Sequence, residues 1–128
     1  MSKVCIIVLF LLCGEMYSQQ KDSLLDCSKF HVGKFIYTQV QGGYSLRSKK
    51  KQISYYKEGW TATFKIKWLE ECKFTLTFVK TSSPNMKTFS KGDVLFVTID
   101  SVEGDCYTFT VEAQGKKLPP TQMCKVKE

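Results

Sequence analysis

The segment from Trp60 to Lys80 constrains the fold more than any other part of the chain, because apolar and polar residues alternate along it almost without a break. Its apolar positions are Ala62, Phe64, Ile66 and Trp68, then Cys72, Phe74, Leu76 and Phe78. Side chains of a strand point to opposite faces with a period of two, so the pattern predicts two half-buried strands. Folding the segment about Glu70 places Trp68 opposite Cys72 and puts every apolar side chain on one face.

Short alternating or β-branched runs, separated by turn-forming residues, continue through the rest of the chain. Outside the central hairpin, the predicted strands cover residues 34–40, 44–47, 52–57, 94–100, 106–113 and 121–127. We expect residues 81–91 to form a loop with at most a single helical turn near Asn85. The spacing predicts an all-β protein of about eight antiparallel strands in a meander. Such a meander forms a small, lipocalin-like barrel or a strongly curved sheet.

The predicted hairpin at residues 94–113 allows two registers. A loop with Gly104 at its centre pairs Ile99 with Phe109, whereas a two-residue turn at Glu103-Gly104 pairs Thr98 with Phe109. The first register buries more apolar surface, and it places Gly104 in a left-handed conformation that glycine adopts without steric cost.

The first twenty residues have the features of a secretory signal. Lys3 provides a positive start, residues 4–12 form a nine-residue apolar core, and polar residues follow Ser18. An apolar run that short cannot span a bilayer, which needs about twenty residues. We therefore expect a signal peptide at 1–20 and a single all-β domain at 21–128, without a transmembrane segment, in the periplasm or secreted. Lipidation at Cys13 is a lesser alternative.

Four cysteines remain in the predicted mature chain: Cys27, Cys72, Cys106 and Cys124. An even number in an exported chain predicts two disulfides, with three possible connectivities. We favour Cys27–Cys72 together with Cys106–Cys124, because folding the last two strands about Gly115 sets the second pair directly opposite. Free thiols are one alternative. A zinc site is disfavoured, since the cysteines lack CxxC-like spacing.

The sequence offers little for catalysis. His31 is the only histidine, no nucleophile motif is present, and most acidic residues fall in predicted turns. We expect a protein that is not an enzyme and needs neither metal nor cofactor.

Two candidate binding surfaces remain. The aromatic content, with nine Phe, six Tyr and two Trp, can line the inside of a barrel. The candidate cavity lining is Phe64, Ile66, Trp68, Phe74, Leu76 and Phe78. The formal charge of +7 favours an anionic partner. The candidate anion-binding face is Arg47, Lys49, Lys50, Lys51, Lys65, Lys67 and Lys73. The simpler interpretations are a filled core and lysines that keep an exposed sheet solvated.

Several spaced residues carry a family resemblance. They are Asp26-Cys27, Phe30 and Gly33-Lys34-Phe35; Phe64 to Leu69, Cys72, Phe74 and Leu76; Gly92-Asp93; and Gly104-Asp105, Tyr107 and Phe109. The chain resembles small exported proteins of flavobacteria and related Bacteroidota, a group without an established activity. The resemblance supports the Cys27–Cys72 bridge. Some members carry an automatic label of DNA topoisomerase IV, which this sequence does not support, because it contains no ATP-binding or strand-cleavage domain.

We therefore expect a monomeric, exported binding protein. The first hypothesis is that it binds a small apolar or amphipathic ligand inside the barrel. The alternative is that its lysine-rich face contacts anionic components of the cell envelope or a partner protein. Export argues against a nucleic-acid partner.

Overall fold

Nine β-strands and one short 3-10 helix make up the part of the chain that the structure, a computed structural model, describes: residues 25–39 and 41–127. The elements are η1 (Ser28–Phe30), β1 (Gly33–Tyr37), β2 (Tyr44–Arg47), β3 (Lys51–Tyr55), β4 (Thr61–Glu70), β5 (Lys73–Thr81), β6 (Val94–Glu103), β7 (Cys106–Ala113), β8 (Lys116–Lys117) and β9 (Thr121–Lys125). The predicted signal peptide, its cleavage region and Cys13 lie outside the described residues.

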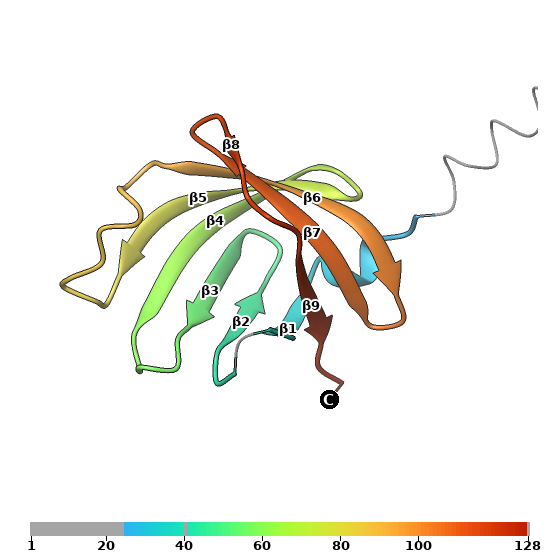
Figure 1. Ribbon diagram of the computed structural model, residues 1–128, viewed down its shortest axis with the longest axis horizontal. Coiled ribbons are helices and arrows are strands. Elements are labelled where there is room, and N and C mark those ends of the chain that lie inside the picture. Colours follow the sequence, from blue (N-terminus) through green and yellow to red (C-terminus); the bar gives the residue numbers. More distant parts are fainter. Residues whose placement is uncertain (1–24, 40, 128) are drawn as a thin grey trace, which may run out of the picture.

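The strands close into an antiparallel barrel (Figure 1). Their order is β6-β5-β4-β3-β2-β1-β9-β7, and β6 also pairs with β7, so eight strands form a ring. The two-residue strand β8 adds a small hairpin to the end of β7. This confirms the predicted all-β fold and shows that the meander forms a closed barrel rather than an open curved sheet.

The central hairpin, β4–β5, has the predicted faces but a different register. Trp68 pairs with Phe74, not with Cys72, and Phe64 pairs with Phe78. The partners of Phe64, Ile66 and Trp68 are thus each shifted by two residues, which leaves these side chains on their predicted face because the period of a strand is two. A bulge next to Phe64 moves the partner of Ala62 by three residues, from Phe78 to Thr81. Residue Cys72 belongs to the turn instead, where its carbonyl accepts a hydrogen bond from the Ile99 N–H at 2.8 Å.

The β6–β7 hairpin adopts the favoured register. Ile99 pairs with Phe109 and Val97 with Val111, and Gly104 has a φ of 62°. A bulge between Ile99 and Ser101 then shifts the pairing by one residue before the turn. The bulge keeps the apolar side chains inside while allowing the short turn.

Each end of the barrel is covered by a segment that lies outside the predicted strands. Helix η1 buries Phe30 completely, with its ring 4.7 Å from that of Tyr107. At the other end, the loop after β5 packs Phe89 against Phe64 and Phe78, with ring centroids 5.5 Å apart in both pairs. The helical turn expected near Asn85 does not form; Pro84 and Asn85 make a simple turn.

Two disulfides brace the barrel, with the predicted connectivity. Cys27–Cys72 ties the segment before η1 to the β4–β5 turn, with Cα atoms 5.3 Å apart. Cys106–Cys124 joins β7 to β9, whose register sets these two residues directly opposite each other. On the chain-entropy model, closing loops of 45 and 18 residues stabilises the fold by about 4 and about 3 kcal/mol, respectively.

Candidate functional site

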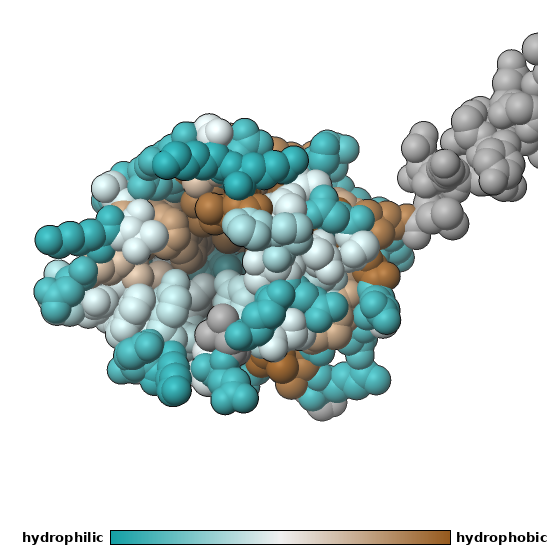
Figure 2. All heavy atoms as spheres, viewed as in Figure 1, coloured by the Kyte–Doolittle hydropathy of each residue, from teal (hydrophilic) through white to brown (hydrophobic). Residues whose placement is uncertain are grey.

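The barrel interior contains a partly open cavity of about 110 Å³. Figure 2 shows a hollow on the viewed face, with apolar residues (brown) along part of its rim. The apolar lining residues lie on β4–β7, β9 and the loop after β5: Phe64, Phe74, Leu76, Phe89, Leu95, Val97, Phe109, Val111 and Met123. The polar lining residues lie on β1–β3 or just after β3, except for Tyr107 on β7: Tyr37, Arg47, Gln52, Ser54, Tyr56 and Tyr107. The cavity therefore has an apolar side and a polar side, a combination typical of small-molecule sites.

The polar side arises from strands β2 and β3, whose inward faces carry Ser45, Arg47, Gln52 and Ser54, here called the polar wall. All four residues are buried, and in the β2–β3 register Ser45 pairs with Ser54 and Arg47 with Gln52. The two serine hydroxyls lie 3.1 Å apart, within hydrogen-bond distance. Buried polar groups need such partners, so the two strands satisfy each other's inward side chains.

Arg47 is the central residue of the polar wall, with only 4% of its surface exposed. Its Nε donates to the Gln52 side-chain oxygen at 2.9 Å, Nη1 donates to the Phe30 carbonyl at 2.8 Å, and Nη2 donates to the Tyr107 hydroxyl at 2.9 Å. Tyr107 in turn donates to the sulfur of Met123 at 3.4 Å. These bonds fix the guanidinium plane at the end of the cavity that η1 covers.

Aromatic rings also hold the guanidinium. Its central carbon lies 4.3 Å from the ring centroid of Phe35 and 4.9 Å from that of Phe74. Such contacts stabilise a desolvated cation by about 2 kcal/mol. No ion pair among the described residues includes Arg47, although burying a charge without a counter-charge is costly.

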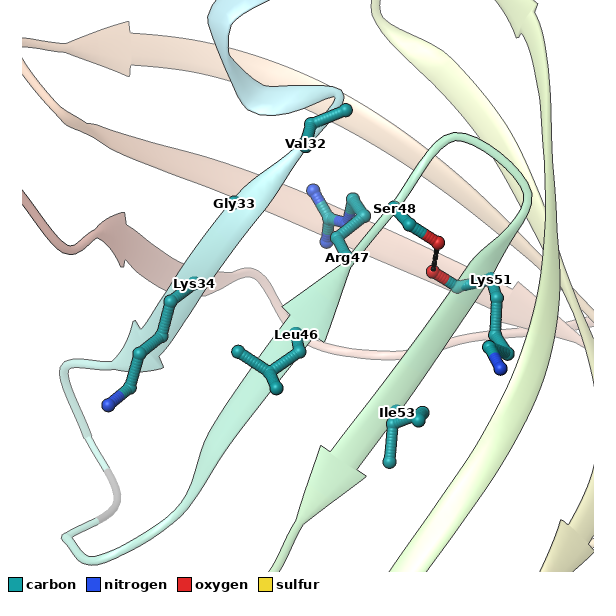
Figure 3. Close-up of a pocket in the computed structure, with 8 residues that line it drawn as sticks. All are labelled: Val32, Gly33, Lys34, Leu46, Arg47, Ser48, Lys51 and Ile53. Carbon is teal, nitrogen blue, oxygen red and sulfur yellow. Dashed lines mark hydrogen bonds between the residues drawn. The ribbon is translucent and has the colours of Figure 1, made fainter. Parts of the chain in front are cut away.

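The position of Arg47 corrects the sequence-based prediction, which placed it on the anion-binding face with the neighbouring lysines. Figure 3 shows its side chain pointing away from those of Leu46 and Ile53, which lie on the outer surface. Arg47 comes two residues after Ser45 on β2, and Gln52 and Ser54 have the same spacing on β3. The two residues of each pair therefore share a face, which is the inward one. This alternation is the sequence signal that could have grouped Arg47 with Ser45, but on these two strands the polar residues face the interior.

The predicted cavity-lining residues divide into two groups. Phe64, Phe74 and Leu76 line the cavity, as expected. Ile66 and Phe78 are buried in the surrounding core, and Trp68 lies near the end covered by η1, with its ring stacked 3.6 Å from that of His31. The aromatic residues thus fill much of the interior, and the cavity is the space that remains.

Two tyrosines at the polar side have perturbed ionisation. Burial, together with nearby Tyr56 and Tyr107 and against the opposing effects of Arg47 and Ser45, raises the pKa of Tyr37 to about 12. Burial also raises the pKa of Tyr56. Both side chains therefore remain neutral hydroxyls at physiological pH and can donate hydrogen bonds.

The six predicted surface lysines are all exposed: Lys49, Lys50, Lys51, Lys65, Lys67 and Lys73. The structure brings Lys51 and Lys65 directly opposite each other on β3 and β4. Beside them, a shallow groove of about 340 Å³ runs over the outside of β1–β3 and exposes Leu46 (Figure 3). Lys73 has an acidic neighbour instead, with its Nζ 3.6 Å from a Glu70 carboxylate oxygen.

The described residues contain no cluster of three or more side chains able to ligate a metal, and none of their helices is long and apolar enough to cross a membrane. His31 is held structurally, with its Nε2 donating to the Glu71 carbonyl at 2.9 Å.

No protein-family model matches the chain, and no curated protein or solved structure matches it either.

Proposed function

We propose that the protein is an exported, non-enzymatic binding protein that holds a small amphipathic ligand inside its barrel. The observation that carries this proposal is the cavity with one apolar and one polar side. A filled barrel gains stability from packing, whereas buried polar groups cost free energy unless they are paired. A polar wall retained beside free space is therefore better suited to a ligand than to stability.

The size of the cavity limits the ligand. Its volume of about 110 Å³ is somewhat below that of an engineered cavity of about 150 Å³ that binds benzene. The ligand would thus be a small aromatic or short aliphatic molecule.

Export is supported by the two disulfides, which form and persist outside the reducing cytoplasm.

Filling the cavity tests this proposal. Val111→Phe places a ring in the cavity, whereas Val94→Phe adds the same ring on the outside of β6, where Val94 is 37% exposed. We expect small aromatic compounds to raise the melting temperature of the wild type and of Val94→Phe, because a ligand that binds only the folded state stabilises it. The Val111→Phe protein should show little or no shift. Equal shifts in both variants would place binding outside the barrel and overturn the proposal.

A second candidate function uses the lysine-rich outer face to bind anionic components of the cell envelope. The observation that favours it is the Lys51–Lys65 pair, because like charges directly opposite on neighbouring strands destabilise a sheet. The proposal predicts binding to anionic vesicles that weakens steeply between about 50 and 500 mM salt, since screening shortens the reach of surface charges. Binding insensitive to salt, or none, would exclude it.

A further inference from the structure

Arg47 has hydrogen-bonding capacity that the protein does not use. A guanidinium carries five N–H donors, and three of them have partners: the Gln52 side-chain oxygen, the Phe30 carbonyl and the Tyr107 hydroxyl. One donor on Nη1 and one on Nη2 have no partner among the described residues. Arg47 also lines the cavity, although it is 96% buried. A buried cation with unused donors beside free space is suited to an incoming acceptor.

The charges around the cavity favour an anion. All three partners of Arg47 are neutral, and none of the residues that line the cavity is an aspartate or glutamate. The ion pairs of the described residues involve Lys29, Lys73 and Lys127, all at the exposed surface. The positive charge of Arg47 is thus uncompensated within the cavity, and a bound anion would remove much of the cost of burying it.

Neighbouring side chains provide further donors. The Gln52 oxygen is occupied by Arg47 Nε, so its amide N–H groups are left for another partner, and the Ser54 hydroxyl lies on the same wall. A planar carboxylate accepts two parallel bonds from a guanidinium, an arrangement more specific than a single contact. Phe74, Leu76 and Phe109 line the same cavity as these donors and would pack against a hydrocarbon body.

We propose that Arg47 anchors the carboxylate of a small aryl or short-chain carboxylic acid, whose apolar body occupies the rest of the cavity. This inference rests on the proposed binding function and specifies the chemical class of its ligand.

Three nearly isosteric probes test the inference on the full-length mature chain: benzoate (anionic), benzamide (neutral) and benzamidinium (cationic), with toluene as an apolar reference. Dissociation constants would be measured by calorimetry or by NMR titration at constant ionic strength. We expect benzoate to bind about 10- to 100-fold more tightly than benzamide, the range typical of a hydrogen-bonded charge. Benzamidinium, which places a cation beside Arg47, should bind more weakly than benzamide.

A matched pair of variants tests the role of Arg47. Gln52→Glu introduces a carboxylate where the side-chain oxygen already lies 2.9 Å from Arg47 Nε, so the protein provides its own counter-charge. We expect this variant to remain folded and to lose at least tenfold in benzoate affinity. Thr77→Glu makes the same charge change on the outer face, opposite Lys65, and should alter benzoate affinity by less than twofold.

The outcomes separate the inference from the proposed function. If benzoate, benzamide and toluene bind equally well, the binding function stands and the carboxylate assignment is wrong. If none of the four compounds binds at millimolar concentration, both are wrong. If Gln52→Glu fails to fold, the preference of the wild type for benzoate over benzamide still decides the question. An undiminished benzoate affinity in folded Gln52→Glu would overturn the role of Arg47.

Discussion

The β2–β3 and β4–β5 hairpins belong to one barrel, yet they distribute polarity in opposite ways. In β4–β5 the interior side chains are apolar, as at Phe64 and Phe74, and lysines and threonines face outward. In β2–β3 the interior is the polar wall, and the outer surface carries Tyr44, Leu46, Ile53 and Tyr55. Alternation with a period of two is thus compatible with either an apolar or a polar interior face. Alternation identifies a strand, but closure of the barrel determines which face is inside.

The difference indicates a division of roles. The β4–β5 hairpin contributes six of the fourteen buried apolar residues of the core, more than any other hairpin, and is tied to the start of the domain by Cys27–Cys72. The β2–β3 hairpin contributes hydrogen bonds and a buried charge, whose net effect on stability is small. We therefore expect stability to depend mainly on the first hairpin and ligand selection on the second.

The largest effect should come from truncating the apolar interior. Phe74 is 2% exposed and packs against Trp68 and Arg47, so Phe74→Ala removes contacts on both sides. We expect a loss of about 3–5 kcal/mol in the free energy of unfolding, measured by urea denaturation. On the polar wall, Ser54→Ala should cost about 1 kcal/mol, the net value of one hydrogen bond. Equal costs would contradict the proposed division.

The next effect should appear at alkaline pH, through Tyr37. Its pKa in the folded protein is raised to about 12, chiefly by burial, from an ordinary value of 10.0. Between these values the unfolded chain releases the proton while the folded protein retains it, so the contribution of Tyr37 to stability is constant below pH 10 and falls as the pH rises toward 12. The loss should reach roughly 2–3 kcal/mol. In Tyr37→Phe most of this slope should disappear, leaving a smaller part from Tyr56. An unchanged slope would show that Tyr37 ionises freely.

The comparison also explains what could be predicted from the sequence. The faces of β4–β5 followed from alternation, because burying Phe64 or Phe74 is favourable in any closed sheet. Its register did not follow, because shifts of two residues leave the same side chains inside, and only tertiary contacts at Cys72 distinguish them. The β6–β7 register was predictable because its alternative buried polar residues.

The polar wall was not predictable on the same basis. Arg47 precedes an exposed lysine run, so local composition assigns it to the surface, whereas its burial depends on Phe30, Phe35 and Tyr107 from distant parts of the chain. Residues 28–30 likewise fall outside the predicted strands, because a single aromatic residue in a polar segment carries no period. The burial of Arg47 and that of Phe30 both depend on contacts that form only when the barrel closes.

A smaller effect should arise on the outer surface of β4. Lys65→Glu replaces a like-charged pair with an attractive one across β3–β4, so we expect a gain of about 0.2–1 kcal/mol at low salt. High salt should reduce the gain. Lys80→Glu makes the same charge change opposite Thr63 and serves as the control. If both variants gain equally, the effect reflects net charge rather than the Lys51–Lys65 pair.

The smallest effect should follow from changing the outer apolar surface of β2, where Leu46 is 40% exposed opposite Ile53. Leu46→Thr exchanges one strand-forming side chain for another at a position already in contact with water, so the free energy of unfolding should change by less than about 0.5 kcal/mol. The matching change inside the barrel, Leu76→Thr, should cost several times more, because Leu76 is 7% exposed and lines the cavity. Urea denaturation of both variants would compare the two faces directly.

A loss above about 1.5 kcal/mol in Leu46→Thr, comparable to the value of a fully buried side chain, would show that the outer surface of β2–β3 is itself part of the stabilising core. The two hairpins would then differ in chemistry but not in their contribution to stability.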